Sequence, residues 1–168
     1  RRTHVPAIQA AIDSGVENIM LVGKKLTDPD RIDGVFWTPS PITVRGNVKR
    51  IFGGWNTFRH SSFISGEPYP DSVFIIEDTN HDDLVIQDLI LFTKADIVNK
   101  SCKNVILQGI KFGAYERDPA TCGDLYLENV WAGHGSLYFG PDEHVWARWL
   151  DVENHGGPLT PIHNDGGR

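Results

Sequence analysis

Four segments of the chain repeat one another without internal gaps, and this repeat limits the possible folds more than any other feature. The segments begin at Asp83, Asn104, Asp124 and His144, so their starts are 21, 20 and 20 residues apart. A unit this short cannot bury its own apolar face, and it becomes stable only by stacking on its neighbours. We therefore expect a fold that is built from stacked coils.

Apolar residues alternate with period two inside these segments, which is typical of strands that bury one face. Sixteen positions, four in each segment, are all apolar. They are Leu84, Val105, Leu125 and Val145; Ile86, Leu107, Leu127 and Ala147; Leu89, Ile110, Val130 and Leu150; and Leu91, Phe112, Ala132 and Val152. Stacked in register, they would form four continuous apolar ladders.

The alternation breaks once in each segment, between the second and third ladders. Asp88, Gly109 and Asn129 occupy the break, and these residue types tolerate left-handed backbone angles. Trp149 is the exception in the fourth segment. Each unit is therefore expected to contain two short strands that meet at a one-residue bend.

A third strand in each unit is indicated seven residues before the segment start. Ile76, Ile97 and Leu137 occupy this position, but Arg117 interrupts the column in the third unit. Coils of about twenty residues with three short strands, stacked in register, form a parallel β-helix. A propeller or a sandwich would instead need antiparallel hairpins, and no two-residue Asn-Gly or Asp-Gly loop joins these strands.

The first part of the chain predicts a short helix followed by less regular coils. Val5, Ile8 and Ile12 have the spacing of one helix face, Pro6 suits the first turn, and Gly15 suits the residue after the end. The expected fold is all-β in a single domain over residues 1–168. Residues 1–15 would form a cap with a helix at 6–14, residues 16–82 irregular first coils (strands at 35–37, 41–44 and 48–52), and residues 83–168 regular coils.

Several stretches resemble a known superfamily. Residues 7–15 resemble the cap-helix motif that opens many pectate-lyase-like β-helix proteins, and residues 42–53 are similar to their first full coil. Residues 144–148, 151–154 and 164–167 resemble a bacterial branch related to glycoside hydrolase family 28. The resemblance covers nearly the whole chain. It implies a right-handed parallel β-helix, usually secreted, that binds or degrades polysaccharide, without implying a particular reaction.

Candidate catalytic motifs do not combine into one site. An Asp pair, Asp82 and Asp83, and a Gly-His-Gly sequence at 133–135 match motifs of the family-28 polygalacturonases. However, His134 lies about half a coil out of phase with Asp83, so the two motifs should lie on opposite sides of the stack. Glu128 and Asp151 could lie on the order of 10 Å apart, near the upper range for inverting glycosidases, but nothing in the sequence indicates that either is a catalytic acid. Whether the chain is an enzyme stays open; an active one would be a polysaccharide lyase or a glycoside hydrolase.

Metal ligands are not indicated by a clear motif. Two acidic groups could be considered for calcium, namely Asp28, Asp30 and Asp33, and Glu77, Asp78, Asp82 and Asp83, but both are better explained as solvated turn residues. The seven histidines lack zinc-ligand spacing. We expect no cofactor, with calcium as the one possibility considered.

The outward-facing columns predict a carbohydrate-binding surface. Aromatic rings stack on the C–H faces of sugars, while carboxylates and guanidinium groups bind hydroxyls through hydrogen bonds. The candidate substrate-binding residues are Lys111, Tyr126, Glu128, Trp131, Trp146, Arg148 and Asp151. A loop packed over the apolar stripe and a subunit contact are the alternatives.

Cys102 and Cys122 are the two cysteines, and each lies two residues before a segment start. They should be stacked in adjacent coils about 4.8 Å apart, within the Cα range of a disulfide. The sequence therefore predicts a Cys102–Cys122 bridge, with two stacked free thiols as the alternative. A bridge would favour an extracellular or periplasmic location.

Charge and chain length limit the partners. A net charge of −6 argues against nucleic acid, and no apolar stretch has the roughly 18 residues of a membrane-spanning helix. The next repeat would begin near Asn164, so we expect a C-terminally truncated chain whose open last coil contacts another chain or a second copy. Two functions remain: an extracellular polysaccharide-binding or polysaccharide-degrading protein, or a non-catalytic structural, adhesive or tailspike-like assembly module.

Overall fold

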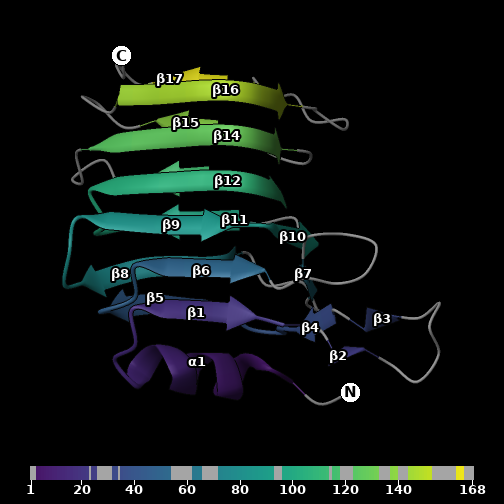
Figure 1. The fold of residues 1–168 in the computed structure, drawn as a ribbon. Helices are drawn as coiled ribbons and strands as arrows, with labels where there is room; N and C mark the ends of the chain where they lie inside the picture. Colours follow the sequence, from purple (N-terminus) through teal and green to yellow (C-terminus); the bar gives the residue numbers. More distant parts are fainter. Residues whose placement is uncertain are drawn as a thin grey trace.

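The computed structural model is all-β with one short helix and two large parallel sheets in the part of the chain that it describes (Figure 1). That part comprises residues 3–22, 24–25, 32–33, 35–53, 62–65, 72–92, 96–113, 115–117, 123–132, 137–139, 144–152 and 162–164.

The larger sheet has nine strands, all paired in parallel. Its main path runs β1-β6-β9-β12-β10-β7-β4, with β14 next to β12 and β16 next to β14. The strands are β1 (Asn18–Leu21), β4 (Val35–Trp37), β6 (Arg50–Gly53), β7 (Ser62–Ser65), β9 (Asp83–Gln87), β10 (Leu89–Phe92), β12 (Asn104–Phe112), β14 (Asp124–Ala132) and β16 (His144–Val152).

The second sheet has six parallel strands in the order β17-β15-β13-β11-β8-β5. They are β5 (Ile42–Gly46), β8 (Ser72–Thr79), β11 (Asp96–Asn99), β13 (Tyr115–Arg117), β15 (Leu137–Phe139) and β17 (Ile162–Asn164). From β8 onwards the chain alternates between the two sheets, once per repeat. A separate antiparallel pair, β2 (Lys24–Lys25) and β3 (Ile32–Asp33), belongs to neither sheet.

The register of the long strands confirms the repeat that the sequence predicts. Asn104 pairs with Asp83 on one side and with Asp124 on the other, and Asp124 pairs with His144. The strands expected in the irregular first coils are also present, as β4, β5 and β6. Each repeat therefore places equivalent residues side by side on neighbouring strands.

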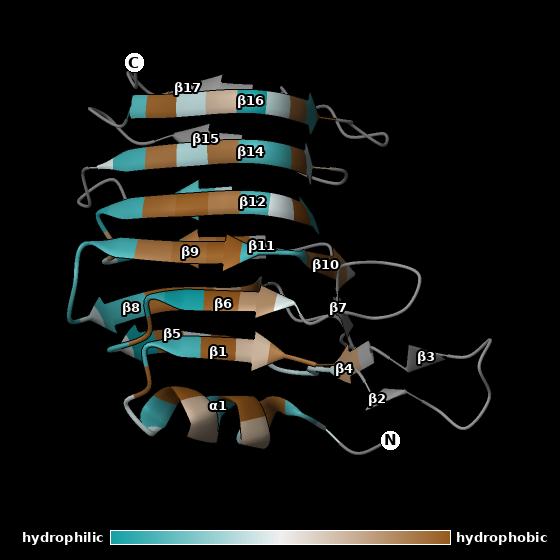
Figure 2. Cartoon of the chain, viewed as in Figure 1, coloured by the Kyte–Doolittle hydropathy of each residue, from teal (hydrophilic) through white to brown (hydrophobic). Residues whose placement is uncertain are grey.

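The apolar ladders form the core between the two sheets. All twelve ladder residues of the first three segments are buried, including Leu84, Val105 and Leu125, which have no exposed surface. In the fourth segment Val145, Leu150 and Val152 are partly buried against this core, whereas Ala147 is exposed. In Figure 2, β14 and β16 are striped with apolar and more polar residues, whereas β9 and β12 are apolar over several consecutive residues.

The bend between the ladders has the left-handed backbone that the residue types indicate. The φ angles are 54° at Asp88, 58° at Gly109, 51° at Asn129 and 58° at Trp149. Strands β12, β14 and β16 continue through the bend, whereas β9 and β10 are separate strands on either side of it. The bend therefore divides the outer face of these strands into two halves.

The third strand of each unit is present, but its register differs from the expected column. Ile97 pairs with Phe74 on one side and with Tyr115 on the other, and Tyr115 pairs with Leu137. Ile76 pairs with Asn99 instead. Ile97 and Leu137 therefore share the expected column, whereas Ile76 and Arg117 lie two residues outside it. The reason is that the links from this strand to the next segment differ in length. Arg117 does not interrupt the strand, and it is buried at the edge of the core.

Arg117 and Asn99 are tolerated in the core because both bind the main chain of one turn, at residues 102–103. The Asn99 side chain accepts a hydrogen bond from the Cys102 amide (2.9 Å) and donates one to the Cys102 carbonyl (2.8 Å). The Arg117 guanidinium donates to the carbonyls of Cys102 and Lys103. Buried polar groups that are satisfied in this way do not carry the usual cost of desolvation.

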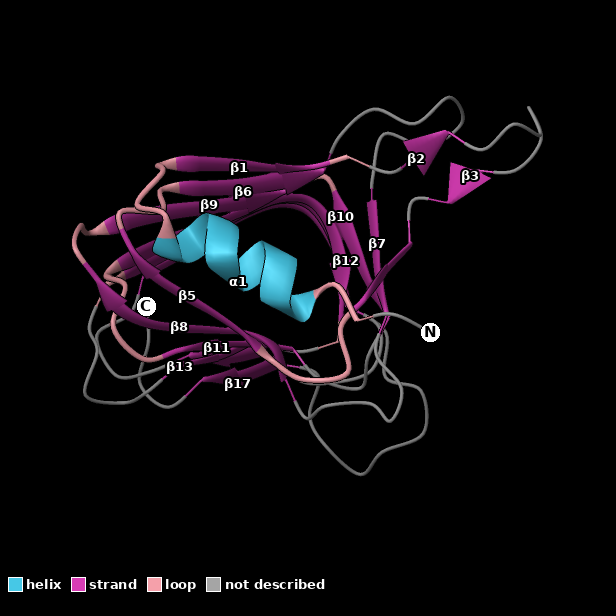
Figure 3. Ribbon diagram, turned by 90° about the horizontal axis from the view of Figure 1, so that it is seen from below, coloured by secondary structure: helices cyan, strands magenta, loops and turns pink. Residues whose placement is uncertain are grey.

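Helix α1 (Val5–Asp13) covers one end of the stack, and its bounds agree with the prediction to within one residue. Figure 3 shows α1 lying across the end of the space between the two sheets. Ile8 and Ile12 face this space and are buried in the core. The Asp13 carboxylate forms an ion pair with Arg45 of β5, at 2.8 Å and 3.0 Å.

Gln9 of α1 replaces a neighbouring strand at the open edge of β5. Its side-chain amide donates to the Thr43 carbonyl and accepts from the Thr43 amide, both at 3.0 Å. An unpaired strand edge is otherwise a template for association with another chain. The cap therefore protects both the apolar end of the core and the main-chain groups of the first strand.

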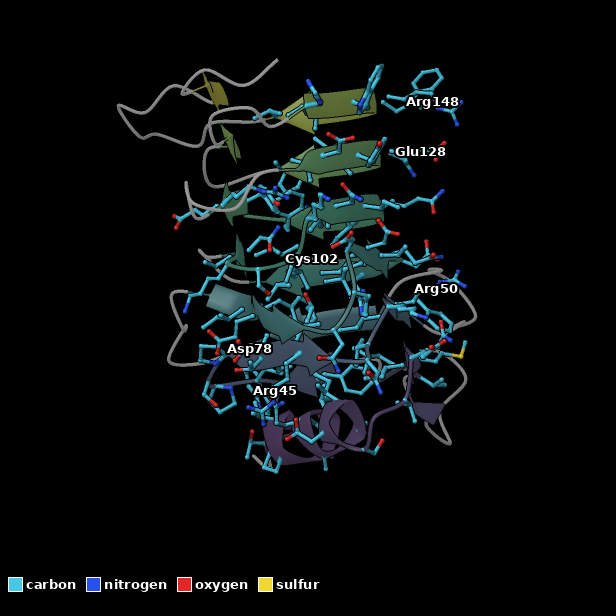
Figure 4. All side chains as sticks on the ribbon, turned by 90° about the vertical axis from the view of Figure 1, so that its left-hand side faces the viewer. Arg45, Arg50, Asp78, Cys102, Glu128 and Arg148 are labelled. Atoms are coloured by element: carbon cyan, nitrogen blue, oxygen red, sulfur yellow. The ribbon has the colours of Figure 1, made fainter. Side chains whose placement is uncertain are left out.

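Cys102 is a free cysteine in the structure and is not a partner in the expected Cys102–Cys122 bridge. Its thiol is buried, with Sγ 3.2 Å from the carbonyl oxygen of Asp82 and 3.4 Å from that of Asn104. Figure 4 places Cys102 within the stack. Cys122 lies outside the described residues.

Gln9→Met should lower the free energy of unfolding by about 1–3 kcal/mol, because the variant keeps the side-chain length but leaves two Thr43 main-chain groups without their partner. Denaturant unfolding followed by circular dichroism measures the change. Glu17→Gln removes only an exposed ion pair with Lys49 and should cause no measurable loss. An equal effect of both variants would contradict the role of Gln9.

Gly109→Ala should destabilise the protein by about 1–2 kcal/mol, because a side chain at positive φ is strained. A Cβ atom at this position would also lie 2.7 Å from Asp88 Oδ1. Asn129→Gly, at the same position of the next coil, should change stability little. Thermal unfolding of the two variants side by side tests the bend, and an unchanged Gly109→Ala variant would refute it.

The Cys102 thiol should react only when the protein unfolds. Burial raises its pKa from 9.0 to about 11, so at pH 8 about one thiol in a thousand is ionised. In protein purified without reductant, Ellman's reagent should detect two thiols in denaturant. In the native state it should not detect the Cys102 thiol. Because only the unfolded thiol ionises between pH 9 and 11, stability should fall as the pH rises through this range. If no free thiol is detected in denaturant, the result would instead support the Cys102–Cys122 disulfide.

Candidate functional site

The candidate substrate-binding residues all lie on one surface, the outer face of β12, β14 and β16, here called the outer face. The seven residues are Lys111 on β12; Tyr126, Glu128 and Trp131 on β14; and Trp146, Arg148 and Asp151 on β16. The register pairs Tyr126 with Trp146, Glu128 with Arg148, and Trp131 with both Lys111 and Asp151. The structure therefore brings the predicted residues together as neighbours.

The bend divides the outer face into two hollows. The first, of about 480 Å³, is lined mainly by Ile106, Tyr126, Glu128, Trp146 and Arg148. The second, of about 360 Å³, lies beyond the bend and is lined by residues that include Lys111, Asn129, Trp131, Trp149 and Asp151. Both hollows extend over β12, β14 and β16, and the second also reaches Ile90 of β10.

The first hollow contains an apolar stripe whose exposure increases along the stack. Val85 and Ile106 are half-buried, whereas Tyr126 is 38% exposed and Trp146 is 62% exposed. Tyr126 and Trp146 are aligned on adjacent parallel strands, which are about 4.8 Å apart. Two large rings are thus presented to solvent at neighbouring positions.

Polar partners hold the Tyr126 ring in place. Its hydroxyl donates a hydrogen bond to Asp124 Oδ2 (3.0 Å), and Asp124 Oδ1 lies 3.2 Å from His144 Nδ1. The hydrogen bond to Asp124, followed by burial and by the charge of Asp124, raises the pKa of the Tyr126 hydroxyl. The hydroxyl therefore remains the donor in the hydrogen bond that connects the ring to Asp124.

A polar ladder runs along the other side of the first hollow. Glu128 accepts a hydrogen bond from Gln108 Nε2 (3.0 Å) and forms an ion pair with Arg148 on the next strand. Figure 4 shows Glu128 and Arg148 one strand apart at the same edge of the stack. Exposed pairs of this kind contribute little to stability, so the groups remain available to hydrogen-bond a ligand.

The second hollow combines an aromatic surface with one positive and one negative side chain. The Lys111 ammonium lies 3.6 Å from the centroid of the Trp131 ring, a cation–π contact. Asp151 is the in-register partner of Trp131 on β16. Trp149 completes the lining, and its side chain is 76% exposed.

Trp149 is the most exposed lining residue that is absent from the predicted site residues. The signal was present, because Trp149 is the one bulky residue in a column otherwise filled by Asp88, Gly109 and Asn129. From the sequence alone Trp149 is an irregularity of the repeat, since nothing in the sequence shows that this column borders a hollow. Gln108 was missed for a similar reason, because its contact with Glu128 depends on side-chain placement.

The carboxylates of the outer face do not form a pair in one hollow. Glu128 lines the first hollow and Asp151 the second, on opposite sides of the bend. The other candidate catalytic motif combined Asp82 and Asp83 with the Gly-His-Gly sequence at 133–135. The Asp83 carboxylate accepts a hydrogen bond from Asn104 Nδ2 (2.6 Å), and residues 133–135 lie outside the described residues. The described part of the outer face therefore supplies binding groups, and it does not place two carboxylates together.

The acidic residues considered for calcium contact lysines of the next turn. Glu77 lies 3.2 Å from Lys100, and Asp82 lies 3.8 Å from Lys103. Asp28 and Asp30, from the other group, lie outside the described residues. Within the described ranges, no three His, Cys, Asp or Glu side chains are grouped so that they could hold a metal ion.

Comparison of the chain with known proteins identifies no relative. Among the described residues there is no helix of the length and apolarity needed to cross a membrane. No family model, no curated protein and no solved structure matches the chain.

Proposed function

We propose that the chain is a right-handed parallel β-helix of the pectate-lyase-like superfamily. The in-register parallel pairing of units about twenty residues apart supports this architecture. The alternation of the chain between two sheets and the helix that covers one end are further support. The resemblance of residues 7–15 to the cap motif of that superfamily agrees with the position of α1.

The function we propose is the binding of an extracellular polysaccharide on the outer face. One observation carries this proposal: Tyr126 and Trp146 present exposed rings on adjacent strands, directly beside the Gln108–Glu128–Arg148 ladder. Sugars offer an apolar C–H face together with hydroxyl groups at their edges. Aromatic rings next to charged hydrogen-bonding groups match both features.

A neutral polysaccharide fits the charges of this surface better than an acidic one. The first hollow has one negative and one positive side chain, Glu128 and Arg148, and the second also has one of each, Asp151 and Lys111. The chain as a whole has a net charge of −6. A polyanion would therefore find no excess of positive charge, and it would be repelled at longer range.

Binding without catalysis is favoured by the separation of Glu128 and Asp151 into different hollows. Hydrolysis of a glycosidic bond by two carboxylates requires both of them to flank that bond. We accordingly propose a glycan-binding or adhesive role outside the cytoplasm, and release of reducing sugars would instead indicate an enzyme.

The test is affinity electrophoresis on a panel of neutral polymers (β-glucan, xylan and glucomannan) with polygalacturonate as the acidic polymer. At least one neutral polymer should retard the protein. Trp146→Ala should weaken that binding about tenfold, or about 1.4 kcal/mol, because one exposed stacking surface is lost.

Met20→Ala is the matched control, since it removes an exposed apolar side chain (46% exposed) of β1, near the capped end of the stack. It should leave binding unchanged. Equal loss in both variants, or retardation by polygalacturonate alone, would contradict the proposed surface and its preference for neutral glycans.

A further inference from the structure

Trp149 combines a strained backbone with an exposed side chain. Its φ angle is 58°, in the left-handed region that bulky residues rarely adopt. Such a conformation is strained for a residue with a bulky side chain. The neighbouring coils use Asp88, Gly109 and Asn129 at the same position, and these types adopt the conformation more easily.

Burial does not offset this strain. The Trp149 side chain is 76% exposed, more than any other large apolar residue among those described as exposed. An indole ring that remains in water gains little from the hydrophobic effect. The stability of the fold therefore gives no account of a tryptophan at this position.

Trp149 is part of the candidate site, because it lines the second hollow. It lies on β16 between Trp146, which lines the first hollow, and Asp151, which lines the second, and it lines the second hollow itself. Because Lys111 already covers Trp131 with its ammonium group, the Trp149 ring is the more accessible aromatic surface there.

We propose that Trp149 is the stacking residue of a second sugar subsite, and that one glycan chain lies along β14 and β16 and occupies both hollows. This inference rests on the proposed function, and it adds the direction of the bound glycan and the residue that extends the site. Lys111 and Asp151 supply a donor and an acceptor to sugar hydroxyls in the second subsite.

The distance between the subsites sets a minimum length for the glycan. Trp146 and Asp151 are five positions apart on one strand, so at about 3.3 Å per residue they are separated by up to about 17 Å. A single sugar ring cannot span this distance, and a disaccharide is too short to fill both subsites. Affinity should therefore increase sharply between a disaccharide and a hexasaccharide.

The experiment is isothermal titration calorimetry with cello-, xylo- and manno-oligosaccharides, using the disaccharide and hexasaccharide of each series. Trp149→Asn is the test variant, because Asn129 shows that asparagine suits this backbone. We expect about a tenfold loss of hexasaccharide affinity from the missing stacking surface. Disaccharide affinity should be retained, and thermal stability should be equal or higher because the strain is relieved. Trp149→Phe keeps an aromatic ring and should recover most of the affinity.

Trp146→Ala is the matched comparison, since it removes the first subsite and should weaken binding of both lengths. If Trp149→Asn binds the hexasaccharide like the parent protein, the second subsite is refuted while the proposed function stands. If no neutral oligosaccharide binds the parent protein at either length, both the subsite and the proposed function fail.

Discussion

In-register parallel pairing is the constraint on which the rest of this structure depends. Asn104 pairs with Asp124 and Asp124 pairs with His144 on adjacent strands. This alignment places the later residues of the three segments beside their equivalents. Since side chains alternate between the two faces of a strand, a slip of one residue would expose each apolar ladder and bury the outer face. The core and the candidate site are thus two consequences of one register.

The bend turns this regular surface into a site with two parts. A left-handed residue at the same position of each coil redirects the strands without breaking their pairing, so that hollows form on both sides. Trp146 then lies before the bend of β16, and Trp149 lies at the bend and borders the second hollow. Aromatic rings on such a rigid sheet lose little conformational freedom when a ligand binds, which favours affinity.

Much of this arrangement was predictable because the repeat carries its information locally. Period-two alternation predicts which residues face inward, and the spacing of 20 or 21 residues predicts which of them become neighbours. The smaller sheet was less predictable, as the pairing of Ile97 with Tyr115 shows, because links of unequal length precede its strands. The free thiol of Cys102 also departs from expectation, since a shared column does not determine the direction of a side chain in a turn.

The sequence by itself determined the strand pattern, the short cap helix and the set of residues on the outer face, because each depends on periodicity and local preference. Only the tertiary structure decided which of these residues share a hollow, that Gln9 completes the edge of β5, and that Trp149 borders the second hollow. These features depend on distances between side chains of different coils. Such distances arise from packing and from the path of the bend, and no local pattern encodes them.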